Sequence, residues 1–157
     1  MNVAIFFGSL SDKDTMAKAA RALDEFEVPY QAFAISAHRL PDVLVATLKE
    51  LETNGTEVII AGAGLAAHLP GVIASKTTIP VIGVPLNGAL DGLDSLLSIV
   101  QMPKDIPVAT VGIDNARNAG LLAVQMLSIK YPELKEKLKQ YREKLTIELT
   151  QQIHQKL

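Results

Sequence analysis

The sequence predicts an α/β fold with three layers, in which a parallel sheet of five strands lies between two layers of helices. Five apolar segments of four to six residues alternate along the chain with longer segments whose apolar residues recur every three or four positions. Neighbouring parallel strands need a crossover between them, so this alternation favours helices on both faces of the sheet. With 157 residues, of which 48% are hydrophobic, one such domain can bury its own core.

The first strand and the first helix are expected at the start of the chain. Residues 3–7 are all apolar and are followed by Gly8, which predicts a buried strand. Ser11 or Asp12 can cap the next helix, and Pro29 stops it. The apolar face predicted for this helix comprises Met16, Ala19, Ala20, Leu23 and Phe26.

The same alternation continues to residue 129. A second strand at 31–36 precedes a helix that begins at Pro41 and is ended by Gly55. The apolar face of that helix comprises Val43, Leu44, Thr47, Leu48 and Leu51. The later strands are expected at 58–61, 81–84 and 108–111, and the later helices up to about Ser75, at 91–101 and at 115–129. For these five strands we expect the flavodoxin-like order 2-1-3-4-5.

Residues 132–157 predict a further helix that is longer than this domain needs. Its 26 residues would extend for about 39 Å. Its apolar residues are Leu134, Leu138, Tyr141, Leu145, Leu149 and Ile153. We therefore expect one domain over 1–157, with a sheet domain at 1–129 and a helix at 130–157 that packs partly on another subunit. The alternative is a helix that folds back along its own domain.

The composition excludes several classes of protein. The chain has no cysteine, so disulfides, thiolate metal sites and cysteine nucleophiles are excluded. It has no run of about 20 apolar residues and no basic N-terminal region, so we expect a cytoplasmic protein without a membrane span or signal peptide. Positive charge gathers in 130–157, where it alternates with glutamate, as is typical of a solvated helix face rather than an arm that binds nucleic acid.

Polar and small residues follow four of the predicted strands, at the edge where doubly wound sheets bind ligands. His38 can transfer protons near neutral pH, and the neighbouring Arg39 offers paired donors to a phosphate or carboxylate. The segment 8–12 is either an anion or hydroxyl site or only a turn and a helix cap. His68 lies among apolar residues and taken alone is more typical of a core histidine, whereas His154 is expected in solvent or at an interface.

The sequence lacks the signatures of several common sites. Gly62-x-Gly64-x-x-Ala67 matches the dinucleotide fingerprint only loosely, because it follows the third strand and has no acidic residue about 20 positions later. There is no phosphate-binding Gly-Lys-Ser/Thr loop and no Gly-x-Ser-x-Gly elbow, and three dispersed histidines make no metal site. These absences leave acid–base chemistry on a small anionic substrate, or binding alone.

Four strings of residues closely resemble the PurE family of purine biosynthesis, in its order and spacing. They lie at 8–12, 36–42, 61–71 and 93–103, within a match that runs from Val3 to about Leu127. The string Ala-Ala-His-Leu-Pro-Gly is similar to class I, the 5-(carboxyamino)imidazole ribonucleotide mutases. The resemblance implies an isomerase that moves a carboxylate from the exocyclic nitrogen to carbon 4 of the imidazole, by decarboxylation and recarboxylation. It also implies no metal or other cofactor, and a homo-octamer whose C-terminal helices reach neighbouring subunits.

The resemblance also implies roles for individual residues. His38 corresponds to the general acid/base, and Asp12 to the residue that accepts hydrogen bonds from the ribose hydroxyls. Arg39, with Ser11 and Ser36, corresponds to the phosphate site. The imidazole and CO₂ would be lined by Ser9, Ala63, Gly64 and His68.

The chain departs from the family pattern in places. Leu65 stands where glycine is usual, and its bulk would narrow the CO₂ pocket unless the side chain points into the core. Leu40 stands where threonine is usual, Asp91 replaces a commoner asparagine or serine, Lys104-Asp105 stands where glycines are frequent, and the loop after Pro85 is one residue shorter.

Three other functions remain as alternatives. The first is the class II reaction, in which aminoimidazole ribonucleotide is carboxylated directly with CO₂. The second is a related carboxylase of nickel-pincer cofactor synthesis, which the absence of cysteine disfavours. The third is a nucleotide-binding protein without activity, which the presence of both His38 and Arg39 disfavours.

Overall fold

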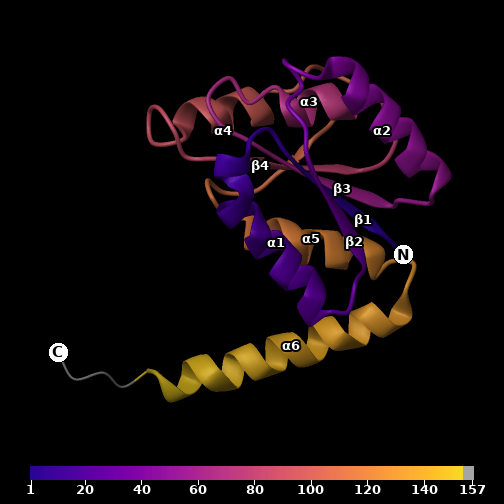
Figure 1. Cartoon of the computed structure of the whole chain (residues 1–157). Helices are drawn as coiled ribbons and strands as arrows, with labels where there is room; N and C mark the ends of the chain where they lie inside the picture. Colours follow the sequence, from indigo (N-terminus) through magenta and orange to yellow (C-terminus); the bar gives the residue numbers. More distant parts are fainter. Residues whose placement is uncertain (154–157) are drawn as a thin grey trace.

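A computed structural model describes residues 1–153 and shows a five-stranded sheet with helices on both faces (Figure 1). Every strand pair is parallel, and the order is β2-β1-β3-β4-β5, so the predicted order is confirmed. The strands are β1 (Val3–Phe7), β2 (Tyr30–Ala34), β3 (Val58–Ala63), β4 (Val81–Pro85) and β5 (Ala109–Thr110). The helices are α1 (Lys13–Glu25), α2 (Pro41–Thr53), α3 (Leu69–Ala74), α4 (Leu93–Val100), α5 (Ala116–Leu127) and α6 (Pro132–Gln151).

The two faces of the sheet bury separate apolar clusters. Alternate residues of a strand point to opposite faces, so Ile5 packs with α1 and α5, whereas Phe6 packs with α2, α3 and α4 (Figure 1). The central strands β1, β3 and β4 are buried along their whole length, as continuous apolar runs in a covered parallel sheet should be.

The end of β3 differs from the prediction, because the strand continues through Gly62 and Ala63. Gly62 pairs with Phe7 on one side and with Val84 on the other. It also lies against α1, where a Cβ on Gly62 would come within 2.3 Å of the Met16 sulfur. Glycine here therefore leaves room for the Met16 side chain of α1 against the strand, rather than serving a loop.

The start of the first helix also differs from the prediction. A 3₁₀ turn, Leu10–Asp12, precedes α1 and has Ser9 as its cap. Asp12 holds the N-cap position of α1, as predicted, but its side chain makes no capping hydrogen bond to that helix. Ser9 has an extended backbone, its Oγ accepts a hydrogen bond from the Ser11 N–H, and its own N–H donates to Asp12 at 3.1 Å. This reciprocal pattern is a capping box, in which two unpaired N–H groups of the turn are satisfied.

The remaining boundaries and faces largely follow the prediction. The helix predicted at 91–101 begins at Leu93, because Asp91 and Gly92 adopt positive φ angles. The edge strand β5 is two residues long, and β2 ends at Ala34. On the predicted helix faces Ala20 is partly buried, and Val43 is exposed.

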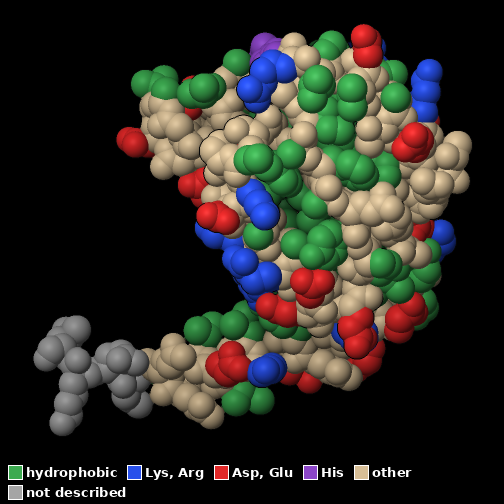
Figure 2. All heavy atoms as spheres, viewed as in Figure 1, with side chains coloured by type: hydrophobic (Ala, Val, Ile, Leu, Met, Phe, Trp, Pro, Cys, Tyr) green, Lys and Arg blue, Asp and Glu red, His purple; other side chains and the backbone are tan. Residues whose placement is uncertain are grey.

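Helix α6 packs on its own domain only near its start. Leu134 is buried, Leu138 and Tyr141 are partly buried, and the Tyr141 ring meets that of Phe26 with centroids 5.5 Å apart. The later part of the helix leaves the body of the molecule (Figures 1 and 2). Its apolar side chains Leu145, Ile147 and Leu149 are exposed, as is Ile153 just beyond the helix. The helix therefore does not fold back along its own domain over its described length.

Within residues 1–153, no helix is both long enough and apolar enough to cross a membrane. The end of the predicted helix, with His154, lies outside the described residues.

Candidate active site

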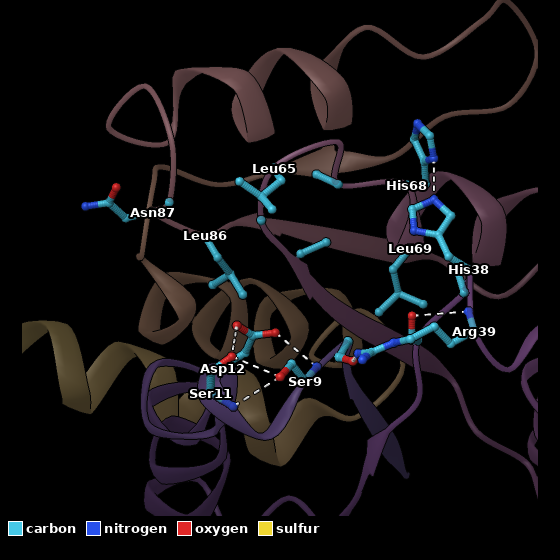
Figure 3. Close-up of a pocket in the computed structure, with 17 residues that line it drawn as sticks. Ser9, Ser11, Asp12, His38, Arg39, Leu65, His68, Leu69, Leu86 and Asn87 are labelled. Atoms are coloured by element: carbon cyan, nitrogen blue, oxygen red, sulfur yellow. Dashed lines mark hydrogen bonds between the residues drawn. The ribbon is translucent and has the colours of Figure 1, made fainter.

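A cavity of about 390 Å³ opens where β1, β2, β3 and β4 end (Figure 3). Parallel register brings these ends together, because Phe7 of β1 pairs with Ala34 and Gly62, and Ala63 of β3 pairs with Pro85. All nine residues predicted for the site line this cavity: Ser9, Ser11, Asp12, Ser36, His38, Arg39, Ala63, Gly64 and His68. The fold therefore gathers residues from three separate loops into one site.

Two histidines from different loops meet at one side of the cavity (Figure 3). Nε2 of His38 lies 2.6 Å from Nδ1 of His68, and the two rings are edge to face with centroids 4.8 Å apart. One ring nitrogen must donate its N–H to the unprotonated nitrogen of the other, so the pair holds one proton between the facing atoms. Because His68 is exposed and lines the cavity, its interpretation as a core histidine is wrong.

Arg39 links the loop after β2 to the loop after β1. Its Nη2 donates to the Gly8 carbonyl oxygen at 3.1 Å, and its backbone N–H donates to the Ser36 Oγ at 3.4 Å. The guanidinium carries five N–H donors in one plane, and this contact engages one of its nitrogens. Arg39 thus brings a fixed positive charge and further donors to the cavity.

The turn at Ser9–Asp12 both caps the helix and lines the cavity. The Ser11 hydroxyl lies 3.0 Å from the Ser9 Oγ and 3.3 Å from the Asp12 carboxylate. The segment is therefore a turn with a helix cap, and its role as an anion or hydroxyl site stays a prediction. The helix cap orders a cluster of two hydroxyls and a carboxylate at the edge of the cavity.

The segment after β3 gives the cavity a wall with little side-chain bulk. Ala63 and Gly64 are followed by a turn in which the Ala67 N–H donates to the Gly64 carbonyl at 2.9 Å. Leu65 within this turn has a φ of +56°, and its side chain lines the cavity instead of entering the core. The bulk expected from Leu65 therefore does lie at the pocket.

The cavity also includes residues outside the nine that were predicted for the site. They are Gly8, Ala37, Leu65, Ala67, Leu69, Leu86, Asn87 and Gly88. Asn87 and Gly88 follow β4, the fourth strand that ends in polar and small residues. That position in the sequence is the signal that could have identified them as site residues. The Asn87 N–H donates to the Asp114 Oδ1 at 2.9 Å, which fixes the start of that loop. In the part of the chain that the structure describes, no three acidic or histidine side chains gather as metal ligands.

Comparison with known proteins agrees with this geometry. The family model described as AIR carboxylase matches residues 2–148. A protein of Pyrococcus abyssi named N5-carboxyaminoimidazole ribonucleotide mutase is 64% identical over 142 residues, which cover 90% of this chain and 82% of the relative. A protein of the same name from Thermotoga maritima is 55% identical over 148 residues, or 94% and 86% of the two chains. The crystal structure of Treponema denticola PurE superposes with a TM-score of 0.88 at 29% identity, and covers 96% of this chain and 94% of that one. The chain therefore belongs to the AIR carboxylase (PurE) family.

Proposed function

We propose that this protein is an N5-carboxyaminoimidazole ribonucleotide mutase of purine biosynthesis. The observation that carries the proposal is that His38 and Arg39 line one cavity with the Ser9–Asp12 turn, in a chain 64% identical to a relative of that name. This arrangement provides a proton-transfer group, a cation for a phosphate, and acceptors for sugar hydroxyls within one small space.

The reaction needs one proton to be added and one to be removed. When the bond between the exocyclic nitrogen and the carboxylate carbon breaks, its electron pair stays on the nitrogen, which takes a proton, and CO₂ is released. Carbon 4 of the imidazole then attacks that CO₂, a carbon–carbon bond forms, and carbon 4 gives up its proton. His38 serves as the group that supplies the first proton and accepts the second, so the enzyme returns to its starting state.

The ribonucleotide's phosphate belongs at the side of the cavity where Arg39 lies. Ser11 and Ser36 add hydroxyl donors, and Asp12 accepts from the ribose hydroxyls. The Gly8 carbonyl holds Arg39 in place at 3.1 Å and leaves its other nitrogen atoms to meet an anion. His68, Ser9, Ala63 and Gly64 surround the imidazole and the CO₂.

A self-associated state, the homo-octamer implied by the PurE resemblance, completes the proposal. It is supported by the end of α6, where Ile147 and Leu149 are more than half exposed, as is Ile153 just beyond the helix. Exposed apolar residues at a helix end that leaves the body of its own domain favour burial against another copy. The cytoplasmic location stays a prediction.

Turnover of separate substrates tests the proposed function. The purified protein is given the carboxyamino ribonucleotide without ATP, and formation of the ring-carboxylated isomer is followed, with His38→Asn as a control for contaminating activity. We expect conversion by the wild-type protein. Conversion only of aminoimidazole ribonucleotide with CO₂ would instead show the class II reaction, and ligand binding without either conversion would show a binding protein.

A further inference from the structure

The turn after β3 holds a leucine in a backbone conformation that suits glycine. Leu65 has a φ of +56°, in the left-handed region where a Cβ crowds the following carbonyl oxygen. Its side chain is 58% exposed and lines the cavity, so burial in the core does not compensate for this strain. Strain that is kept beside a reactive cavity points to a role in the reaction.

The Leu65 side chain reaches the loop after β4. A Cβ placed on Gly88 would lie 3.3 Å from the Leu65 Cδ2, so the methyl group rests against the Gly88 backbone. The contact joins two strand ends that both line the cavity. Figure 3 shows Leu65 between Asn87 and the pair of histidines.

The loop that receives Leu65 is anchored on both sides of Gly88. Before Gly88, the Leu86 N–H donates to the Ala63 carbonyl at 2.9 Å, while the buried Ser95 hydroxyl donates to the Leu86 carbonyl at 2.9 Å. After it, the Ser95 hydroxyl also lies 2.8 Å from the Gly92 carbonyl oxygen. Leu65 therefore packs against an anchored loop, and the contact lines one side of the cavity with apolar atoms.

We propose that Leu65, packed against Gly88, retains CO₂ in the pocket between the two halves of the reaction. This inference rests on the proposed mutase function. The nitrogen–carbon bond breaks before the carbon–carbon bond forms, so a CO₂ molecule that escapes leaves aminoimidazole ribonucleotide in place of product. An apolar side chain in the wall of the cavity slows that escape without taking part in proton transfer.

Carbon exchange during turnover measures this retention directly. The carboxyamino ribonucleotide is converted in buffer containing ¹³C-bicarbonate and carbonic anhydrase, and the label in the first product is measured by mass spectrometry. We expect Leu65→Ala and Leu65→Gly each to raise the labelled fraction by about threefold to tenfold, because a barrier to escape is removed. Free aminoimidazole ribonucleotide should rise in parallel.

The two variants separate retention from strain. Leu65→Gly removes both the side chain and the strained Cβ, and its Tm should rise by about 2–4 °C. Leu65→Ala keeps the Cβ, so its Tm should not rise. Asp105→Gly is the matched control, because Asp105 has a φ of +74° outside the cavity, and it should leave the labelled fraction unchanged.

The results distinguish this inference from the function on which it rests. If the wild-type protein forms no ring-carboxylated product, the proposed function is wrong and the role of Leu65 fails with it. If the wild-type protein converts its substrate and both Leu65 variants incorporate no more label than it does, only the role of Leu65 is overturned.

Discussion

His38 and His68 stand 30 residues apart in the chain, yet their facing ring nitrogens, Nε2 and Nδ1, are 2.6 Å apart. One histidine follows β2 and the other follows β3, so the sheet brings them together. The hydrogen bond between the facing nitrogens orients the His38 ring, whichever of the two rings donates the proton. We therefore expect His68 to position His38, in addition to its place in the cavity wall.

Replacement of His38 tests the proton-transfer role. His38→Asn should reduce kcat by at least about 100-fold, the lower end of a general acid/base contribution. The protein should remain folded and bind substrate, because the His38 side chain is exposed and makes no core contact. Steady-state kinetics measure kcat, thermal unfolding checks that the variant is folded, and calorimetric titration checks that it binds substrate. Near-normal turnover in this variant would contradict the assignment.

Replacement of His68 tests whether that residue positions His38. His68→Ala removes the hydrogen bond and should lower kcat by about tenfold, the value of a single bond of this kind. His68→Asn places an amide atom close to the former Nδ1 position and should recover part of the loss. A wild-type kcat in the alanine variant would show that the contact does not matter for turnover.

The ion pair between Glu25 and Arg117 should contribute to the acid dependence of stability. Arg117 donates to both carboxylate oxygens of Glu25, at 2.9 and 2.8 Å, and joins the end of α1 to α5. Hydrogen bonding to Arg117 outweighs partial burial and lowers the pKa of Glu25 below its ordinary value of 4.5. The stabilisation is therefore complete above pH 4.5 and is lost as the pH falls through the lowered pKa.

A Glu25→Gln variant checks this pH dependence. At pH 7 it should be less stable than the wild-type protein by about 0.5–1 kcal/mol, because the pair is partly exposed. The difference should disappear in strong acid, where the wild-type carboxylate is also protonated. Denaturant unfolding from pH 7 down to pH 3 measures both limits, with Glu50→Gln on the exposed side of α2 as a control that follows the wild type. A constant difference across this range would refute the ion-pair effect.

The exposed end of α6 should carry the contacts between subunits. Leu145 and Leu149 continue the stripe that Leu134 begins, but they are 37% and 55% exposed. The test substitutes Leu145→Glu and Leu149→Glu together in the full chain. The dissociation constant of the assembly should rise by at least about tenfold for each of these side chains that an interface would bury. Light scattering coupled to size exclusion measures the mass, with Gln140→Glu as a charge control. A wild-type chain that is monomeric would contradict the octamer.

The local pattern of residues predicted most of the fold. Alternating apolar segments gave the five strands, and Pro41 and Asn115 mark the beginnings of α2 and α5. The boundaries that shifted depend on contacts distant in sequence. Gly62 belongs to β3 because two neighbouring strands pair with it, and Ser9 caps the turn because Asp12 folds back to its N–H.

The sequence by itself determined the parallel sheet, its order, and the loop segments that meet at one edge, because strand ends of a parallel sheet share one edge. The choice of nine residues within those segments came from the resemblance to the PurE family, and all nine line one cavity. Only the tertiary structure decided which of these residues touch. The His38–His68 contact and the approach of Leu65 to Gly88 depend on strand register and on backbone angles after β3. Periodicity fixes the face on which a side chain lies, whereas a contact between two loops is set by the distances that the assembled sheet imposes.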